Sequence, residues 1–266
     1  MPNIIDTFRS IAPITPALAS LLTLACFAPA SADEPKGAAA VKPAQSAAEK
    51  ATADQADAAT WTNLDIREGG DWVESKFGGD GEVKVKDGVI TLGFGDPLTG
   101  VRWKGKFPKN NYEITVEARR TNGFDFFCGL TLPAADQRFS LILGGWGGSL
   151  IGISSIGGED AAHNETMIIR QFEQNRWYKV RTRVTDKKLE AWLDDDNIVD
   201  FTRDDRPLDI RAELEQSVPV GFASFQTIAE LRNIRVRELT PVEIAASGKP
   251  ETANDSKSPA KPSDKP

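Results

Sequence analysis

The residues best suited to acid–base chemistry fall in one short polar segment, GGEDAAHNET (157–166). Asp160, His163, Asn164 and Glu165 lie within six positions, and His163 is the only histidine of the 266-residue chain. Imidazole gains and loses its proton near neutral pH, so His163, or Asp160 beside it, is the natural general acid or base. The ordinary alternative is a lone histidine that merely faces solvent in a polar loop.

A second candidate lies just upstream, where Trp146 stands between two pairs of glycines in GGWGG (144–148). Tryptophan faces stack on the CH surfaces of sugars, and glycine lets a ligand approach the main chain closely. This pattern predicts a substrate-binding site at Trp146, with Asp125 and Asn164 as further binding residues. The alternative is a β-bulge or strand crossing around a core tryptophan.

Two other groups of acidic residues are better explained by structural roles. Glycosidases hold two carboxyl groups about 5–10 Å apart, whereas Glu113 and Glu117 on one extended strand are separated by about 13 Å. A solvated outer face explains these two glutamates. Asp194, Asp195 and Asp196 are explained by a hairpin turn.

Cofactor chemistry is poorly supported. One histidine, together with the single cysteine that would remain after cleavage of a signal peptide, cannot supply the ligands of a zinc site. A calcium site from Asp160, Asn164 and Glu165 is allowed by the residue types but not indicated. The glycine run lacks the Lys-Ser/Thr pair of a phosphate loop, so no nucleotide is expected, and no redox cofactor either.

The N-terminus predicts export. Arg9 is followed by an apolar run (14–27) and by Ala30-Ser31-Ala32, so residues 1–32 fit a signal peptide. Acylation of Cys26 is an alternative that its upstream residues fit poorly. Cleavage would leave a secreted, periplasmic or cell-envelope protein with no transmembrane span, and Cys128 as its only cysteine. Cys128 sits in the apolar run FDFFCGL and is expected to be a buried hydrophobe.

The net charge of the chain limits the classes of binding partner. A net charge of −7 disfavours nucleic acid and anionic membrane surfaces, and it is compatible with a neutral carbohydrate ligand. The oligomeric state is not indicated by any pattern in the sequence.

These candidate residues must be positioned by strands. Residues 33–60 have the composition of a low-complexity linker, and residues 241–266 that of a disordered tail. Between them, residues 61–240 alternate apolar and polar side chains, as in NYEITVEARR (111–120), and Asp87-Gly88 predicts a tight hairpin. Only DIRAELEQ (209–216) suits a short helix. Ten or more strands predict an all-β, antiparallel, two-sheet jelly-roll sandwich whose first and last segments pair.

The order of these segments is similar to that of a known family. GVITL, YEITVEARR, FDFFCGL, RWYKVRTRVTDKKLEAWLDDDNIVD and the closing LRNIRVREL resemble the 3-keto-disaccharide hydrolase domain, a bacterial and often secreted group with the concanavalin A-like fold. The resemblance covers most of residues 61–239 and implies hydrolysis of the glycosidic bond of (3-keto-)glycosides. The usual Asn-Ser-Gly turn is replaced here by TNGFD (121–125), so no catalytic residue is carried over. The E-x-D-x-x-E strand of laminarinase-like enzymes is absent.

The resulting hypothesis is an exported carbohydrate-active domain with a groove lined by Trp146, Asp125, Arg102, Asp160 and His163. His163 or Asp160 would move protons, Trp146 would hold the sugar, and Arg102 would polarise a keto oxygen. A non-catalytic carbohydrate-binding or adhesion module is the first alternative. A structural envelope protein is the second, and it predicts a fully buried Trp146.

Overall fold

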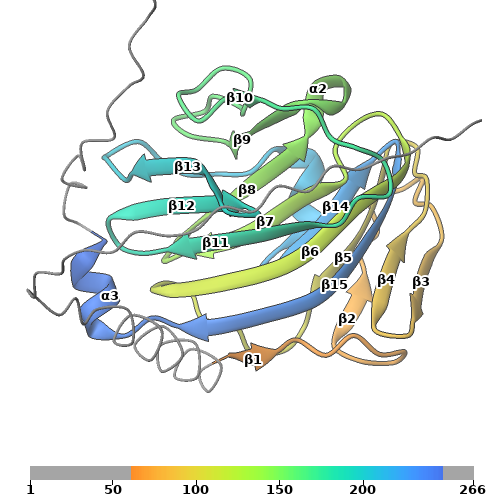
Figure 1. Cartoon of the computed structure of the whole chain (residues 1–266), viewed down its shortest axis with the longest axis horizontal. Coiled ribbons are helices and arrows are strands. Elements are labelled where there is room, and N and C mark those ends of the chain that lie inside the picture. Colours follow the sequence, from red (N-terminus) through yellow and green to blue (C-terminus); the bar gives the residue numbers. More distant parts are fainter. Residues whose placement is uncertain (1–60, 248–266) are drawn as a thin grey trace, which may run out of the picture. The chain divides into compact units, whose positions relative to one another are not determined.

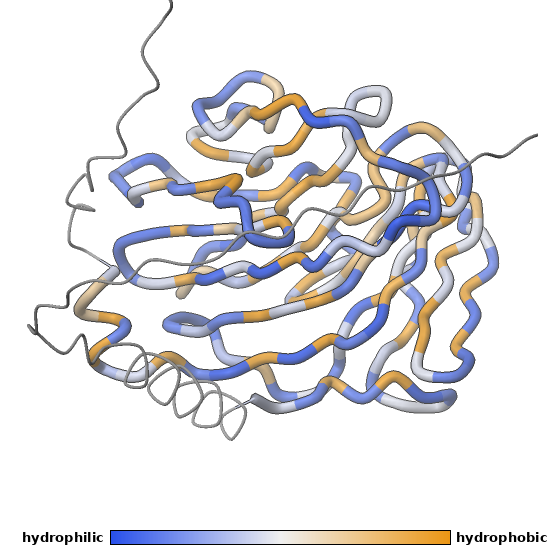
Figure 2. The backbone as a smooth tube through the Cα atoms, viewed as in Figure 1, coloured by the Kyte–Doolittle hydropathy of each residue, from blue (hydrophilic) through white to orange (hydrophobic). Residues whose placement is uncertain are grey.

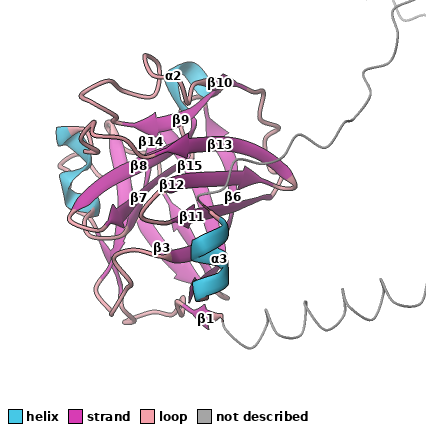
Figure 3. Ribbon diagram, turned by 90° about the vertical axis from the view of Figure 1, so that its left-hand side faces the viewer, coloured by secondary structure: helices cyan, strands magenta, loops and turns pink. Residues whose placement is uncertain are grey.

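The computed structural model describes residues 61–247, which form two antiparallel β-sheets packed face to face (Figures 1 and 3). The predicted jelly-roll sandwich is confirmed. The predicted signal peptide (1–32), the predicted linker (33–60) and residues 248–266 of the predicted tail lie outside the described residues.

The eight-stranded sheet has the order β13-β12-β11-β6-β15-β4-β3, with β1 paired to β15. Its strands are β1 (Thr62–Asn63), β3 (Val83–Lys86), β4 (Val89–Leu92), β6 (Tyr112–Gly123), β11 (Tyr178–Val184), β12 (Lys188–Leu193), β13 (Asp196–Thr202) and β15 (Thr227–Glu238). The β1–β15 pair joins the first and last strands, as predicted.

The seven-stranded sheet has the order β10-β9-β8-β7-β14-β5-β2. Its strands are β2 (Trp72–Glu74), β5 (Leu98–Trp103), β7 (Cys128–Ala134), β8 (Gln137–Gly144), β9 (Leu150–Ser154), β10 (Ile168–Ile169) and β14 (Gly221–Phe225). Three short helical segments complete the described region: α2 (Gly145–Gly148), the 3₁₀ helix η1 (Ala212–Ser217) and α3 (Pro241–Ala246).

The period-two pattern creates the core between the sheets, and Figure 2 shows hydrophobic and hydrophilic positions alternating along the strands. On β6 the predicted apolar face, Tyr112, Ile114, Val116 and Ala118, is at most 1% exposed. Cys128 on β7 is fully buried in the same core, as predicted, and burial raises the pKa of its thiol to about 12. Such a thiol is a packing group and not a nucleophile.

Local turn signals act where they were expected. Asp87 and Gly88 both have positive φ, 51° and 74°, in the hairpin between β3 and β4. Asp194 also has positive φ and starts the turn between β12 and β13, and its carboxylate accepts a hydrogen bond from the Lys179 amide. The turn therefore accounts for the aspartates there.

The outer face of the eight-stranded sheet differs from the expectation of a solvated surface. Glu113 is only 2% exposed, because Arg183, Arg181 and Arg237 approach its carboxylate at 2.7, 3.3 and 3.5 Å. Glu117 is partly exposed and pairs with Arg232 at 2.7 Å. Both glutamates thus belong to an ion-pair network rather than to a catalytic pair.

The outer face of the seven-stranded sheet carries small side chains. Gly129 on β7 pairs with Ala223 on β14 and with Ile142 on β8, and Ala223 in turn pairs with Gly100 on β5. Side chains this small leave a shallow apolar depression over the centre of the sheet. Ile142, Leu98 and Ala223 form its floor.

The connection between β13 and β14 (residues 203–220, named here the strap) crosses this depression. Ile210 and Leu214 of the strap pack into the apolar cluster on the sheet. Asp209 and Ser155 exchange two backbone hydrogen bonds, of 2.6 and 3.2 Å, which fix the strap beside the end of β9. The predicted short helix is present within the strap as η1. The strap therefore covers the apolar cluster at the centre of the face.

Two elements differ from the sequence predictions. Residues 150–154 form β9, all five of them buried, in a stretch for which the sequence predicts no strand. Residues 241–246 form α3 in the predicted disordered tail, because Thr240 and Glu243 make a reciprocal capping box and Glu243 pairs with Arg237 at 2.8 Å. Within residues 61–247, none of the helices has the length and apolarity needed to cross a membrane.

Candidate functional site

Two adjoining pockets open beside the strap, and Arg211 lines both. The first, named here the apolar pocket, has a volume of about 200 Å³ and is lined by Asp125, Phe126, Ile142, Trp146, Arg211, Glu213, Leu214 and Phe225. The second, named here the polar pocket, has a volume of about 510 Å³ and is lined by Ser155, Gly158, Glu159, Asp160, His163, Ile210 and Arg211. Together they form the best candidate site in the described region.

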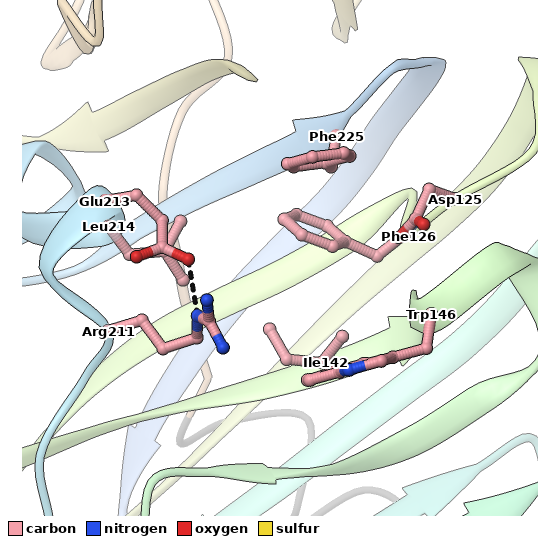
Figure 4. Close-up of a pocket in the computed structure, with 8 residues that line it drawn as sticks. All are labelled: Asp125, Phe126, Ile142, Trp146, Arg211, Glu213, Leu214 and Phe225. Carbon is pink, nitrogen blue, oxygen red and sulfur yellow. Dashed lines mark hydrogen bonds and ion pairs between the residues drawn. The ribbon is translucent and has the colours of Figure 1, made fainter. Parts of the chain in front are cut away.

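The apolar pocket is built from side chains of both the sheet and the strap. The rings of Phe126 and Phe225 lie 5.7 Å apart, tilted by 41°, and Leu214 faces them from η1 (Figure 4). Ile142 of β8 lies between Trp146 and Arg211 in the same view. Five of the eight lining residues thus present hydrocarbon or aromatic surface.

Trp146 stands on a strained turn at the rim of this pocket. Its φ of 49° is left-handed, and 43% of the residue is exposed. Asp125 holds the turn, since one carboxylate oxygen accepts from the Gly147 amide at 2.9 Å and the other from the Phe126 amide at 2.8 Å. The exposed ring does not fit the alternative of a core tryptophan.

Arg120, near the end of β6, is buried beneath the turn that carries Trp146 and donates hydrogen bonds to its backbone. It is 7% exposed and donates to the carbonyl oxygens of Gly148, Asp125 and Phe172 at 3.2 to 3.4 Å. Burial lowers the pKa of its guanidinium, yet an arginine stays charged in proteins. The cation therefore orders the loop that carries Trp146.

The polar pocket contains an aspartate–histidine pair. Asp160 Oδ1 lies 2.7 Å from His163 Nδ1 and accepts from the Ala162 amide at 3.0 Å. Its other oxygen accepts from Arg211 at 3.1 Å. The Asp160 side chain is 19% exposed and that of His163 72%, so the imidazole reaches solvent from an anchored partner. A carboxylate in this position orients the ring and favours the tautomer protonated on Nδ1.

Arg211 joins the two pockets. Besides Asp160, its guanidinium contacts the carboxylate of Glu213, the interaction drawn in Figure 4. Arg211 and Glu213 both lie on the strap, so the strap supplies charged residues to both pockets. A fixed guanidinium there is suited to stabilise negative charge on a ligand oxygen.

The expectation for Asn164 needs correcting. The residue is 8% exposed, and its amide donates to the carbonyls of Ile153, Glu159 and Asp160, while its oxygen accepts from Thr166. These contacts use the hydrogen-bonding groups of the Asn164 side chain within the protein. Asn164 therefore shapes the segment that presents Asp160 and His163, and it has no group left for a substrate.

Arg102 is also not beside the other candidates. It lies on the outer face of β5, four residues beyond Leu98, which corresponds to about 13 Å along the strand. It lines neither pocket. Arg211, in contrast, lines both pockets.

The residues considered for calcium are engaged elsewhere. Glu165 pairs with Arg206, and the hydrogen bond from that guanidinium lowers the pKa of the carboxyl. In residues 61–247 no group of three or more His, Cys, Asp or Glu side chains is arranged to hold a metal ion.

The model of a family described as the 3-keto-alpha-glucoside-1,2-lyase-like domain matches residues 48–237, well over half of the chain. The chain belongs to this family. The predicted family resemblance is thereby confirmed. No curated protein matches the chain at a significant level.

Three solved structures with a similar fold are distant from this chain in sequence. Carbohydrate-binding module CBM66 from Bacillus subtilis shares 11% identity over 63% of this chain and 96% of its own, with a TM-score of 0.42. A Crh5 transglycosylase in complex with NAG shares 12% over 68% and 85%, with a TM-score of 0.48. A lichenase from a mouse hindgut metagenome shares 8% over 68% and 98%, with a TM-score of 0.45. Values this low carry no information on activity.

Proposed function

We propose that the two pockets form one groove that binds a 3-keto-glycoside and cleaves its glycosidic bond. The observation that supports this most directly is the Asp160–His163 pair beside Arg211, at the junction of a polar and an apolar pocket. Family membership supports the substrate class. Export remains a prediction from the N-terminal sequence.

The chemistry follows from the ketone. A carbonyl at C3 makes the hydrogen on C2 acidic, because the charge left behind spreads onto the carbonyl oxygen. His163, with its Nδ1 proton held by Asp160, offers Nε2 as the base that removes this proton. Arg211 stabilises the negative oxygen.

The electron pair then forms a double bond between C1 and C2, and the bond from C1 to the glycosidic oxygen breaks. The leaving oxygen takes the proton back from His163, so the base is regenerated. Addition of water across the double bond gives 3-keto-glucose, and the net reaction is the hydrolysis expected from the sequence. Without that addition, the unsaturated sugar is released.

A non-catalytic sugar-binding module is the second candidate. The exposed ring of Trp146 at the pocket rim favours it, because an open aromatic face binds sugars without any chemistry. In that case the Asp160–His163 pair would only shape the loop.

The decisive experiment incubates the full-length protein with the 3-keto derivative of trehalose, with 3-keto phenyl glucoside, and with the unoxidised parents. We expect consumption of 3-keto compounds only, with release of glucose or phenol. His163→Asn provides the control for the base. Saturable binding without consumption of any 3-keto compound would establish the module instead, and neither binding nor consumption would overturn both candidates.

A further inference from the structure

We infer that the apolar pocket receives an aromatic leaving group, so that the preferred substrates are 3-keto-glycosides of phenols rather than of sugars. The inference rests on the proposed function, which it deepens. It concerns the apolar pocket, to which the proposed cleavage chemistry assigns no part of the substrate.

The carboxylates of Asp125 and Glu213 and the guanidinium of Arg211, which line the apolar pocket, are engaged within the protein. Both carboxylate oxygens of Asp125 accept backbone hydrogen bonds from the Trp146 turn and from Phe126. Arg211 and Glu213 hold each other, and Arg211 also holds Asp160. A sugar ring placed here would bury several hydroxyl groups with few partners, which is unfavourable.

An aromatic ring, in contrast, would pack favourably in the apolar pocket. Phe126 and Phe225 offer tilted ring faces, Ile142 and Leu214 offer aliphatic surface, and Trp146 borders the opening (Figure 4). Aromatic rings gain from offset or edge-to-face contacts as well as from leaving water. The volume of about 200 Å³ lies below the ~300–1,000 Å³ usual for drug-sized ligands, which suits a single ring.

The polar pocket has the complementary character. Ser155, Glu159, Asp160 and His163 line it together with Arg211, so a hydroxylated ring finds donors and acceptors there. Arg211 stands where the two pockets meet. If the sugar of a glycoside occupies the polar pocket and its phenol occupies the apolar pocket, the scissile bond lies next to Arg211. In this arrangement Trp146 contacts the leaving group, not the sugar as the sequence suggested.

The test compares 3-keto phenyl glucoside with 3-keto trehalose in the wild-type protein and in Phe225→Ala. We expect Phe225→Ala to lower kcat/KM at least 10-fold for the phenyl substrate, mainly through KM, and less than 2-fold for the trehalose derivative. Each ratio is taken within one substrate, so the better leaving ability of phenolate cancels. Phe94→Ala is the matched control, because Phe94 is 52% exposed and lines neither pocket. It should change neither value.

Equal losses for both substrates, or none for either, would overturn the inference while leaving the proposed function intact. If neither substrate is cleaved, the proposed function fails, and titration with 4-nitrophenol then decides the pocket. Saturable binding that Phe225→Ala abolishes supports an aromatic site, and absence of binding overturns it.

If Phe225→Ala does not fold, a wild-type KM for the phenyl substrate at least 10-fold below that for the trehalose derivative supports the inference, and equal KM values overturn it.

Discussion

The outer faces of the two sheets are built in opposite ways. On the eight-stranded sheet, Glu113 is surrounded by arginines, and Arg181 lies 3.6 Å above the Trp192 ring. On the seven-stranded sheet, Gly129 and Ala223 are small, and the Phe126 ring and the strap pack over them. Long charged side chains that pair with one another leave no room for a ligand. Small side chains leave room that a separate segment can shape into pockets.

We therefore expect the first face to contribute stability and the second face to bind the proposed ligand. The charged groups of the first face mostly have partners on neighbouring strands, so changes there should act on folding. The charged groups that line the pockets of the second face come from loops and the strap and include an exposed imidazole, so changes there should act on turnover. Each of the following experiments probes one side of this division.

The largest effect is expected from Glu113→Ala. Removing a carboxylate that is 3% exposed in its side chain leaves the cations of Arg181, Arg183 and Arg237 without their shared partner. The free energy of unfolding, measured by urea denaturation, should fall by about 3–5 kcal/mol. Glu117→Ala is the control, since its side chain is 29% exposed, and it should cost about 1 kcal/mol or less. Equal costs would contradict a structural role specific to Glu113.

His163→Asn should have the opposite profile. We expect kcat on 3-keto substrates to fall about 10²- to 10⁴-fold, because the base is lost. The free energy of unfolding should stay within about 0.5 kcal/mol, since the imidazole is largely exposed. Glu165→Gln, two residues away and outside both pockets, should leave kcat unchanged. A stable, fully active His163→Asn protein would remove the proposed base.

The turn under Trp146 tests how rigid the pocket rim must be. A Cβ at Gly148 would lie 2.6 Å from the Phe124 carbonyl oxygen, and its φ of 106° disfavours a side chain. Gly148→Ala should therefore lower the free energy of unfolding by more than about 1 kcal/mol and raise KM. Gly147→Ala shares the positive φ but meets no atom within 4 Å, so it isolates the effect of strain. Identical results for the two variants would show that the contact with Phe124 is unimportant.

The smallest effect concerns α3 and low pH. Burial tends to raise the pKa of Glu243, but hydrogen bonds from Arg237 and Thr240 outweigh it and bring the pKa from 4.5 to about 2. A carboxyl with a lowered pKa stabilises the folded state fully above pH 4.5 and loses that contribution as the pH falls towards 2. The protection of the amides of residues 241–247, taken as their exchange rate relative to the intrinsic rate at the same pH, should fall over this window. In Glu243→Gln this protection should already be low at pH 7 and should not change between pH 4.5 and 2.

The sheets could be predicted from sequence because their signals are local. Alternation along β6 and the Asp87-Gly88 turn each depend on neighbouring residues only. The capping box at Thr240 and Glu243, with Pro241 between them, was an equally local signal that would have revealed α3. The composition of the whole tail obscured it.

The site could be predicted only in part, because its members come from distant segments. Trp146, Asp125, Asp160 and His163 stood out by residue type, and the structure places them on two adjoining pockets. Arg211 pairs with Asp160 across 51 positions, and no pattern in the sequence connects them.

Phe126 and Phe225 illustrate the same difficulty. They meet because β14 pairs with β7, and two phenylalanines among 13 carry no mark of that contact. Only the register of the strands identifies them as pocket residues.

The solitary imidazole has a practical consequence for spectroscopy. A sample labelled with ¹⁵N-histidine contains one side-chain pair of ring nitrogens, so its spectrum needs no assignment. The shifts of these two nuclei distinguish which of them carries hydrogen, and thereby report in solution on the 2.7 Å contact with Asp160. Adding a candidate ligand to that sample reads out occupancy of the groove at a single, unambiguous resonance.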